Sequence, residues 1–381
     1  MKLQTFSLAS PTDAIPLPDP TLDSAETLVL LFGAPGLIDS PSQLRRISEI
    51  YPRAHLVGCS TSGEIFGDKI QDDSLVVGVA RFEKSTLRVA AAPIGTESSY
   101  SAGQALGHAL KETNLRAVLV FSDGLQVNGS ELVRGFNAVL PESVVVTGGL
   151  AGDGDRFART WVIKDREMQA GFVTATGLYG DALRIGHGSK GGWDVFGVER
   201  TVTRAEANVL FELDGTPALS LYKAYLGDRA SGLPATGLLF PLALRDPANA
   251  EKRLVRTILA IDEANQSLTF AGDIPLGFYA QLMCANFDRL IEGAGDAALA
   301  AAATTTANPA PENTLAIAIS CVGRRLVLGE HCEEEIEATL KVLGPNTQQI
   351  GFYSYGEISP YASGHCDLHN QTMTLTTIAE I

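Results

Sequence analysis

The sequence predicts an α/β protein of mixed sheets covered by helices, built from pseudo-repeated strand–helix–strand–strand units. The pattern Gly-x-x-x-x-Gly-Glu-Ile occurs at residues 58–65 and again at residues 351–358. Each copy follows an apolar run, a helical pattern and a short second apolar segment, and each precedes a further strand-like run. Strands that alternate with helical patterns are typical of layered α/β folds.

The elements of the first unit are expected as strand, helix, strand and strand at residues 28–32, 43–50, 56–57 and 75–80. The last unit repeats this order at residues 315–319, 334–343, 349–350 and 372–378. A looser copy lies between them, with apolar segments at 118–121 and 144–146, a helix at 130–140 and a glycine loop at 147–153. Asn128 and Glu131 have the spacing of a helix N-cap, and Pro141 ends that helix. The sequence therefore predicts three related units.

The remaining elements follow from local patterns. Helices are predicted at 99–113 and 216–226, a strand at 183–187, a hairpin at 253–271 and a loop at 304–313. A long helix is expected after Pro275, with Leu282, Leu290, Ile291 and Ala294 on its inner face. We divide the chain into a flexible arm (1–24), an N-terminal domain (25–226) and a C-terminal domain (227–381). Since the final unit mirrors the first, the two domains could share their sheets and core.

Composition narrows the range of partners. The chain has 381 residues, 45% hydrophobic and 19% charged, which is typical of a globular protein. Its formal net charge of −15 repels phosphate backbones, so nucleic acid is not an expected partner. The first 20 residues lack the apolar core of a secretory signal, and the apolar run 297–303 is too short to span a membrane. Five widely spaced cysteines without a Cys-x-x-Cys pair indicate reduced thiols and a cytoplasmic location.

Short phrases along the chain point to one family. They read GCSTSGE at 58–64, GGLAGD at 148–153, VTRAEAN at 202–208, LDGTPA at 213–218, LTFAGDIP at 268–275 and LHNQTMT at 368–374. In this order they resemble the FIST sensory domains, N-terminal and C-terminal parts together, from about residue 27 to the end. The resemblance implies an intracellular input module that senses a ligand rather than turning it over. Some relatives look like haem-binding nitric-oxide sensors that work with a histidine kinase, and a separate kinase-type partner is expected here.

The glycine loops are the first candidate ligand site. Glycine permits close backbone approach and leaves N–H groups free for an anionic ligand group. The candidate ligand-binding residues in the three loops are Gly58, Ser60, Gly63, Glu64, Gly149, Asp153, Gly356 and Glu357. Glu64 and Glu357 could bind a ligand amine or cap backbone N–H groups, and the simpler explanation is that all three loops are tight turns. Glutamate stands where a nucleotide-binding loop has lysine, which argues against a nucleotide.

Haem is the second candidate ligand. His187 is the candidate axial ligand, because small residues follow it at 188, 191 and 192 and Trp193 could pack on a flat macrocycle. The resemblance adds weight, since the family often has a His-Gly pair here. Many relatives have a cysteine after that pair, where this chain has Ser189. His369 is the second candidate ligand, and the alternative for His187 is a turn histidine bonded to backbone.

Metal and enzyme hypotheses are weaker. His365, Cys366 and His369 could supply zinc ligands, but their spacing suits a helix and the region reads as a hairpin, so no metal site is predicted. Cys59 follows a strand, although its loop is one residue too long for a nucleophile turn and a buried thiol is the simpler explanation. We therefore expect a non-enzymatic sensor that binds a small molecule. The alternatives are an amino-acid sensor without haem, a Cys59-dependent enzyme such as a racemase or amidase, and an interaction module without ligand.

Overall fold

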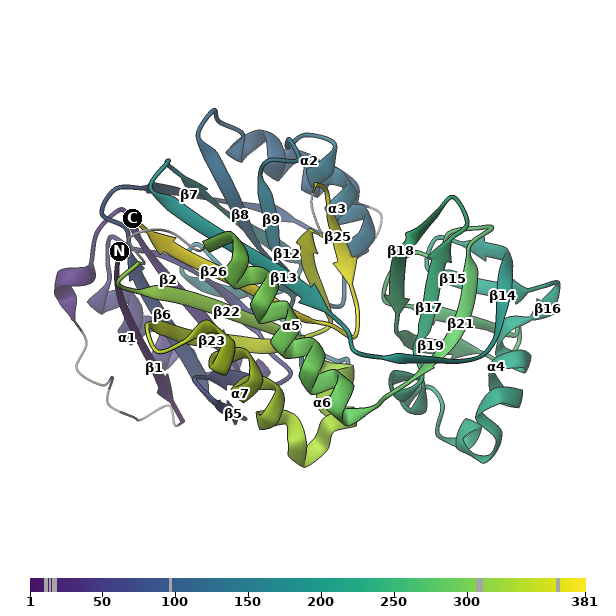
Figure 1. The fold of residues 1–381 in the computed structure, drawn as a ribbon. Coiled ribbons are helices and arrows are strands. Elements are labelled where there is room, and N and C mark those ends of the chain that lie inside the picture. The colour runs from purple at the N-terminus through teal and green to yellow at the C-terminus, as the bar shows by residue number, and fades with distance from the viewer. Residues whose placement is uncertain (10–12, 14, 16–18, 96–97, 306–310, 361–363) are drawn as a thin grey trace.

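The computed structural model describes residues 1–9, 13, 15, 19–95, 98–305, 311–360 and 364–381. Figure 1 shows two bodies: a large one that holds both ends of the chain, and a smaller one formed by the segment from β14 (Asp194–Glu206) to β21 (Tyr279–Cys284). The chain leaves the large body after β13 (Leu183–Lys190) and returns to it at α5 (Phe287–Thr305). The smaller body is therefore an insertion in the larger one.

Three related units build the large body. Unit 1 contains β2 (Thr27–Gly33), α1 (Ser42–Ile50), β3 (His55–Ser60), β4 (Glu64–Phe66), β5 (Lys69–Gln71) and β6 (Leu75–Arg81). Unit 2 contains β8 (Leu115–Ser122), α3 (Gly129–Asn137), β9 (Val145–Leu150), β10 (Val162–Lys164), β11 (Glu167–Gln169) and β12 (Phe172–Tyr179). Unit 3 contains β22 (Thr314–Cys321), α6 (Val322–Leu328), α7 (Cys332–Leu343), β23 (Thr347–Ser354), β24 (Gly356–Pro360), β25 (Cys366–His369) and β26 (Met373–Glu380). The predicted α/β class and its repeated unit are confirmed.

The units exchange their hairpins in a ring. In each unit the first two strands are parallel and the last strand is antiparallel to the first. The β4–β5 hairpin of unit 1 joins the sheet of unit 3, β10–β11 of unit 2 joins unit 1, and β24–β25 of unit 3 joins unit 2. An edge strand completes each six-stranded sheet: β1 (Lys2–Leu8), β7 (Thr86–Pro93) or β13. The result is a closed, pseudo-threefold arrangement with one shared core.

Aromatic side chains mark the centre of this core. Phe32, Phe121 and Phe352, one from each unit, have ring centroids 4.7–6.2 Å apart and are essentially inaccessible. Helices cover the outer faces of the sheets: α2 (Ser99–Leu110) lies beside α3, and α5 crosses the sheet of unit 3 (Figure 1). Three aromatic rings in edge and tilted contact add specific geometry to the area they bury.

The small body has its own sheet and core. Its other strands are β15 (Val209–Leu213), β16 (Thr216–Pro217), β17 (Leu242–Asp246), β18 (Asn249–Arg256), β19 (Ile258–Asp262) and β20 (Ser267–Phe270), and α4 (Ala218–Leu226) packs on them. Short 3-10 helices occur at Pro20–Leu22, Pro35–Asp39, Gly227–Gly232, Ala235–Leu239 and Gly329–His331. Leu210, Tyr222 and Phe270 are buried in a cluster confined to this body.

Two predictions of organisation are wrong. The segment 1–24 is not simply a flexible arm, because residues 2–8 form β1 and pair along their whole length with β6. The helix expected after Pro275 begins only at Phe287, because Tyr279–Cys284 pairs with β14 and β17 as strand β21. The boundary expected at residue 226 between the two domains lies at the end of α4, inside the small body, and it stays a prediction. The expected sharing of sheets is confirmed, since β13, β4 and β5 complete the sheet of unit 3.

Candidate functional site

The three glycine loops meet and bond to one another. The Gly152 N–H donates to Ser60 O (3.0 Å), and the Ser62 N–H donates to Tyr353 O (2.8 Å). The Gly154 N–H donates to Ser62 Oγ (2.9 Å), and the Tyr355 hydroxyl donates to Gly154 O (3.0 Å). Ser60 is fully buried and its Oγ accepts from Trp161 N. These N–H groups are therefore occupied by the protein, which favours the tight-turn explanation over an anion site.

Close packing accounts for the candidate glycines. Gly58 has φ +151°, and a Cβ there would lie 1.8 Å from Leu31 O on the parallel neighbour strand. Gly63 has φ +125° and faces the Arg325 guanidinium. A Cβ at Gly149 would lie 3.0 Å from Ile319 Cγ2, and one at Gly356 would lie 3.0 Å from a Leu150 methyl carbon. All four positions lack a side chain because another element occupies the space.

Glu64 and Glu357 have equivalent, buried positions. Glu64 accepts hydrogen bonds from the Thr61 hydroxyl and from Ser74 N (3.1 Å) and Oγ (2.8 Å). Glu357 accepts from Ser354 Oγ (2.6 Å) and from Thr372 N (3.2 Å) and Oγ1 (2.9 Å). Their exposed fractions are 1% and 0%. Each carboxyl group thus joins its loop to the start of the last strand of the unit, and the geometry favours this capping role over contact with a ligand.

These two carboxyl groups predict a pH-dependent stability. Burial raises the pKa of Glu357 to about 8 and that of Glu64 to about 7, from a usual 4.5. The unfolded chain loses these protons near pH 4.5, so the contribution to stability is complete below that pH and is lost as the pH rises to about 7 for Glu64 and about 8 for Glu357. We expect urea unfolding free energies to fall by up to about 1.4 kcal/mol per pH unit and per group in that window. Glu357→Gln, which has no proton to lose, should show a shallower fall, and equal slopes would contradict the assignment.

Asp153 and Tyr355 join the loops of units 2 and 3. Asp153 accepts from Ala158 N and Arg159 N, both at 2.8 Å, and also from the Tyr355 hydroxyl. The ring of Tyr355 stacks on Phe157, with centroids 4.6 Å apart and planes 15° from parallel. Phe157 has a positive φ of 49°, which is uncommon for a bulky residue. Asp153 therefore fixes the Tyr355 ring that stacks on Phe157.

A cavity lies beside this aromatic pair. It has a volume of about 170 Å³ and is lined by residues of both bodies: Gly124, Leu125, Val127, Asn128, Leu150, Phe157 and Tyr355 from the large body, and Asn208, Leu259, Phe270, Ala271 and Gly272 from the small body. Leu125 and Leu259 lie at its rim, since both are more than a third exposed. A concave, mixed apolar and polar site between two bodies is the usual setting of a small-ligand site.

Hydrogen bonds connect the two bodies next to the cavity. Asn128 Nδ2 donates to Asp273 Oδ1 (3.0 Å), and the Asp273 N–H donates to Ser130 Oγ (3.3 Å). Asn128 Oδ1 also accepts from Glu131 N (3.1 Å), so the predicted N-cap of α3 is confirmed. Farther along the same junction, Gln371 Nε2 donates to Leu238 O (2.9 Å). Any molecule in the cavity would therefore contact the residues that fix the position of the small body.

The residues around His187 do not fit haem. His187 lies half-buried in β13, and burial lowers its pKa. The glycines beside it accommodate α5 rather than a macrocycle, because a Cβ at Gly188 or Gly192 would lie 2.1 Å from a backbone oxygen of that helix. Trp193 is buried, and its indole N–H donates to Gln371 O (2.9 Å). The space that the sequence suggested for haem is filled by the protein.

The other histidines are held by the protein as well. His369 is buried in β25 with its Nε2 3.0 Å from Ser359 O, and His365 lies 3.2 Å from a carboxylate oxygen of Glu142. Cys366 is buried beside them. Within the described ranges no group of three or more His, Cys, Asp or Glu side chains could hold a metal ion.

Cys59 lies in the core rather than in a reactive setting. It is inaccessible and lies in the cluster that contains Phe32 and Val162, and burial raises its pKa. We expect thiol reagents at neutral pH to modify the partly exposed Cys284 first and Cys59 on the order of a hundredfold more slowly, because the thiolate is the reactive form. Mass spectrometry of the labelled protein, with Cys284→Ser as the control, measures both rates. Fast, selective labelling of Cys59 would instead support the enzyme hypothesis.

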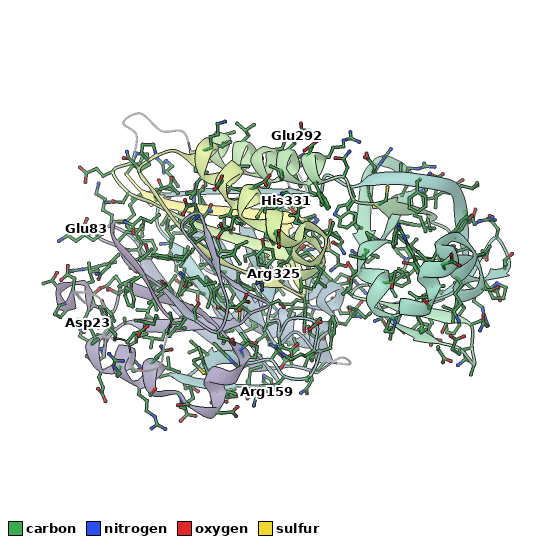
Figure 2. The ribbon with its side chains drawn as sticks, turned by 90° about the horizontal axis from the view of Figure 1, so that it is seen from below. Asp23, Glu83, Arg159, Glu292, Arg325 and His331 are labelled. Atoms are coloured by element: carbon green, nitrogen blue, oxygen red, sulfur yellow. The ribbon has the colours of Figure 1, made fainter. Side chains whose placement is uncertain are left out.

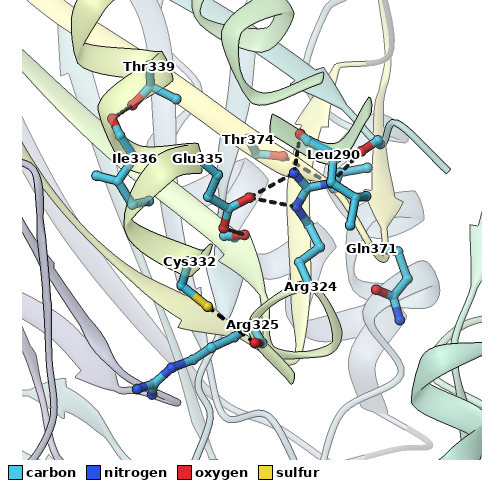
Figure 3. A network of polar contacts seen from close by, with 12 residues as sticks. Leu290, Arg324, Arg325, Cys332, Glu335, Ile336, Thr339, Gln371 and Thr374 are labelled. Atoms are coloured by element: carbon cyan, nitrogen blue, oxygen red, sulfur yellow. Dashed lines mark hydrogen bonds and ion pairs between the residues drawn. The ribbon is translucent and has the colours of Figure 1, made fainter. Parts of the chain in front are cut away.

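A buried ion pair connects the helices of unit 3 with α5 (Figure 3). Arg324 and Glu335 are both 0% exposed, and Glu335 Oε2 accepts from Arg324 Nη2 (2.7 Å) and Nε (3.0 Å). Arg324 also donates to Leu290 O at the start of α5 and to Gly191 O. Glu335 Oε1 accepts from Ser320 Oγ (2.9 Å) and Tyr353 Oη (2.8 Å). The pair therefore connects α6 and α7 with α5 and with two strands of unit 3.

Sequence reasoning missed most of the cavity. Tyr355 lies inside a predicted loop, and Asn208 lies in one of the quoted phrases, yet neither had a signal that separated it from its neighbours. Phe157 follows the glycine loop at residues 147–153, and its positive φ is visible only in the structure. The structure connects Asp153 to the cavity through Tyr355, and it places Gly58, Ser60 and Glu64 in the interior of unit 1.

Comparison with known proteins covers most of the chain. A family model described as the FIST N domain matches residues 27–216, and one described as the FIST C domain matches residues 218–360. No curated protein matches. The two matches meet at α4, inside the small body, so both contribute residues to the cavity. In the part of the chain that the structure describes, no helix is long and apolar enough to cross a membrane.

Proposed function

The chain belongs to the family of FIST N and FIST C domain proteins, and from this we propose that it is a sensor that binds a small molecule between its two bodies. Domains of this family are associated with signal transduction through small ligands. The observation that carries the proposal is the cavity of about 170 Å³ whose lining comes from both bodies. A ligand that binds one position of the small body more tightly than another shifts the equilibrium between those positions.

The signal is transmitted to a separate signalling protein such as a histidine kinase, whose interaction with this protein depends on the position of the small body. The five cysteines are all free thiols, which supports a location in the reducing cytoplasm. The geometry at His187 favours a small metabolite over haem, because α5 occupies the space beside that histidine. A metabolite library that includes amino acids is the first set of compounds to test, and an enzyme is the less favoured alternative because Cys59 is buried.

A screen combined with a distance measurement tests this function. A metabolite library is first tested for compounds that raise the melting temperature of the protein. Donor and acceptor dyes are then attached at Leu276→Cys in the small body and Asp181→Cys in the large body, in a Cys284→Ser background, since residues 276 and 181 are highly exposed. We expect a stabilising compound to change energy transfer between the dyes. A compound that stabilises the protein without changing the transfer would contradict a relay through the small body.

A further inference from the structure

The pseudo-threefold ring has three equivalent junctions between units, which we call crevices. Each lies between the glycine loop of one unit and the connection that follows the first strand of a neighbouring unit. Arg325 bonds to Ser62 O where unit 3 meets unit 1, and Trp161 Nε1 bonds to Pro35 O (3.2 Å) where unit 2 meets unit 1. Gly124 lies against Tyr355 where unit 2 meets unit 3. The cavity occupies this last crevice, next to the small body.

The protein fills the crevice between units 3 and 1 with a planar group of its own. The Arg325 guanidinium donates to Ser62 O and to both carboxylate oxygens of Asp72, at 2.8 and 2.6 Å. Its central carbon lies 5.5 Å from the centroid of the Tyr353 ring. Figure 2 shows Arg325 where the N-terminal and C-terminal segments of the large body meet. This crevice therefore binds a flat N–H-bearing group between a backbone carbonyl and an aromatic ring.

The turn that supplies the counter-charge in unit 1 has a different residue in unit 3. The turn 72–74 corresponds to 370–372, because Asp73 and Gln371 both have positive φ and the next residue, Ser74 or Thr372, donates to the buried glutamate. Asn370 therefore stands where Asp72 stands in the other unit. Its side chain is fully buried, and neither of its amide atoms has a partner in the described structure. The carboxylate that balances a guanidinium is thus replaced by a neutral amide.

The cavity offers polar backbone groups but no charged side chain among its lining residues. Among the described residues, no group donates a hydrogen bond to the backbone oxygen of Tyr355. Gly272 is buried, and its backbone N–H donates to no described residue. A buried N–H without an acceptor costs free energy, so a partner inside the cavity is favoured. The acceptor on the large body and the donor on the small body would both be satisfied by one group that carries an N–H and a carbonyl.

We infer that the ligand is an uncharged, planar compound with a carboxamide or urea group. This inference rests on the proposed function, since it names the chemical class of the same site. A protein cavity of about 150 Å³ accommodates benzene, so a volume of about 170 Å³ suits one ring with a small substituent. The amide N–H donates to Tyr355 O, its carbonyl accepts from Gly272 N–H, and the ring packs on Phe157. The N–H of the ligand thus bonds to Tyr355 O as the Arg325 guanidinium bonds to Ser62 O, the equivalent position of the other loop.

Four probes test this class by calorimetric titration of the full chain at 25 °C. Benzamide has the ring and the neutral amide, benzoate carries a charge, cyclohexanecarboxamide lacks planarity, and toluene lacks the polar group. We expect benzamide to bind at least about tenfold more tightly than each of the others, which is the range set by one or two good hydrogen bonds. Leu125→Trp, which fills the rim of the cavity, should abolish binding. Leu276→Trp, an equally large change at a surface position 66% exposed, should leave it unchanged.

Each other outcome overturns the inference in a distinct way. Tighter binding of benzoate means that the site takes an anion, and equal binding of toluene means that apolar contact alone decides. Benzamide binding that survives Leu125→Trp places the ligand elsewhere. If none of the four probes binds, the chemical class is wrong, while the proposed function is still decided separately by the metabolite screen and the dye measurement.

Discussion

Glu335→Ala is expected to reduce the free energy of unfolding by about 3–5 kcal/mol, the usual result of breaking a buried ion pair from one side. The change leaves the Arg324 guanidinium inaccessible with no counter-ion, and the Ser320 and Tyr353 hydroxyls lose their acceptor. Urea unfolding followed by circular dichroism measures the loss.

Glu112→Ala is the matched control. Glu112 pairs with Arg88 at the surface, where both side chains are about half exposed, and exposed pairs contribute roughly 0–1 kcal/mol. The double substitution Arg324→Met with Glu335→Leu should recover part of the loss, because it removes both charges together. A Glu335→Ala protein as stable as the Glu112→Ala protein would show that the pair is not a buried anchor of the three helices.

Gly58→Ala is expected to prevent folding or to lower the free energy of unfolding by more than about 4 kcal/mol. Losses of this size are exceptional for a single substitution and require a specific structural cause, here a forced rearrangement of the backbone. The new Cβ would lie 1.8 Å from Leu31 O, and its φ of +151° is unfavourable for any residue with a side chain. Soluble yield and thermal unfolding measure the effect.

Gly67→Ala separates the clash from the cost of a positive φ. Gly67 has φ +61°, and no atom lies within 4 Å of the position that a Cβ would take, so a cost of only about 1–2 kcal/mol is expected. A Gly58→Ala protein that folds normally but loses ligand binding would instead support Gly58 as a ligand contact.

Local patterns predicted the units but not the exchange between them. The glycine loops, the apolar runs and the Asn128 cap are signals within about ten residues, and each corresponds to a real element. The hairpin strands β4 and β10 are short, and β4 pairs with residues 350–352, near the other end of the chain. No local periodicity specifies such a partner, because pairing is decided by which sheet edge is available in the folded chain. The helix expected after Pro275 failed for a related reason, since β21 is fixed by its neighbours β14 and β17.

The candidate site could be anticipated only in part. Conspicuous residues such as Glu64 and Gly58 drew attention because their pattern repeats, and the repeat reflects the architecture of the units. The cavity is lined by common residues, Leu125 and Leu259 among them, that lie far apart in the sequence. Their meeting depends on how the inserted body docks on the large one. The glycines beside His187 suggested free space for a ligand, but the sequence could not show that α5 occupies that space.

The ring of exchanged hairpins has a consequence for synthesis on the ribosome. Unit 1 needs β10–β11 of unit 2, unit 2 needs β24–β25 of unit 3, and unit 3 needs β4–β5 of unit 1. The ring cannot close until the residues of β25 have been translated, so the nascent chain carries open sheet edges for most of its synthesis. Unpaired strand edges can form hydrogen bonds with the wrong strand or with another chain. The inserted body, whose strands all lie between residues 194 and 284, can close during that time, so an emerging chain acquires one wall of the cavity before the ring that carries the other wall.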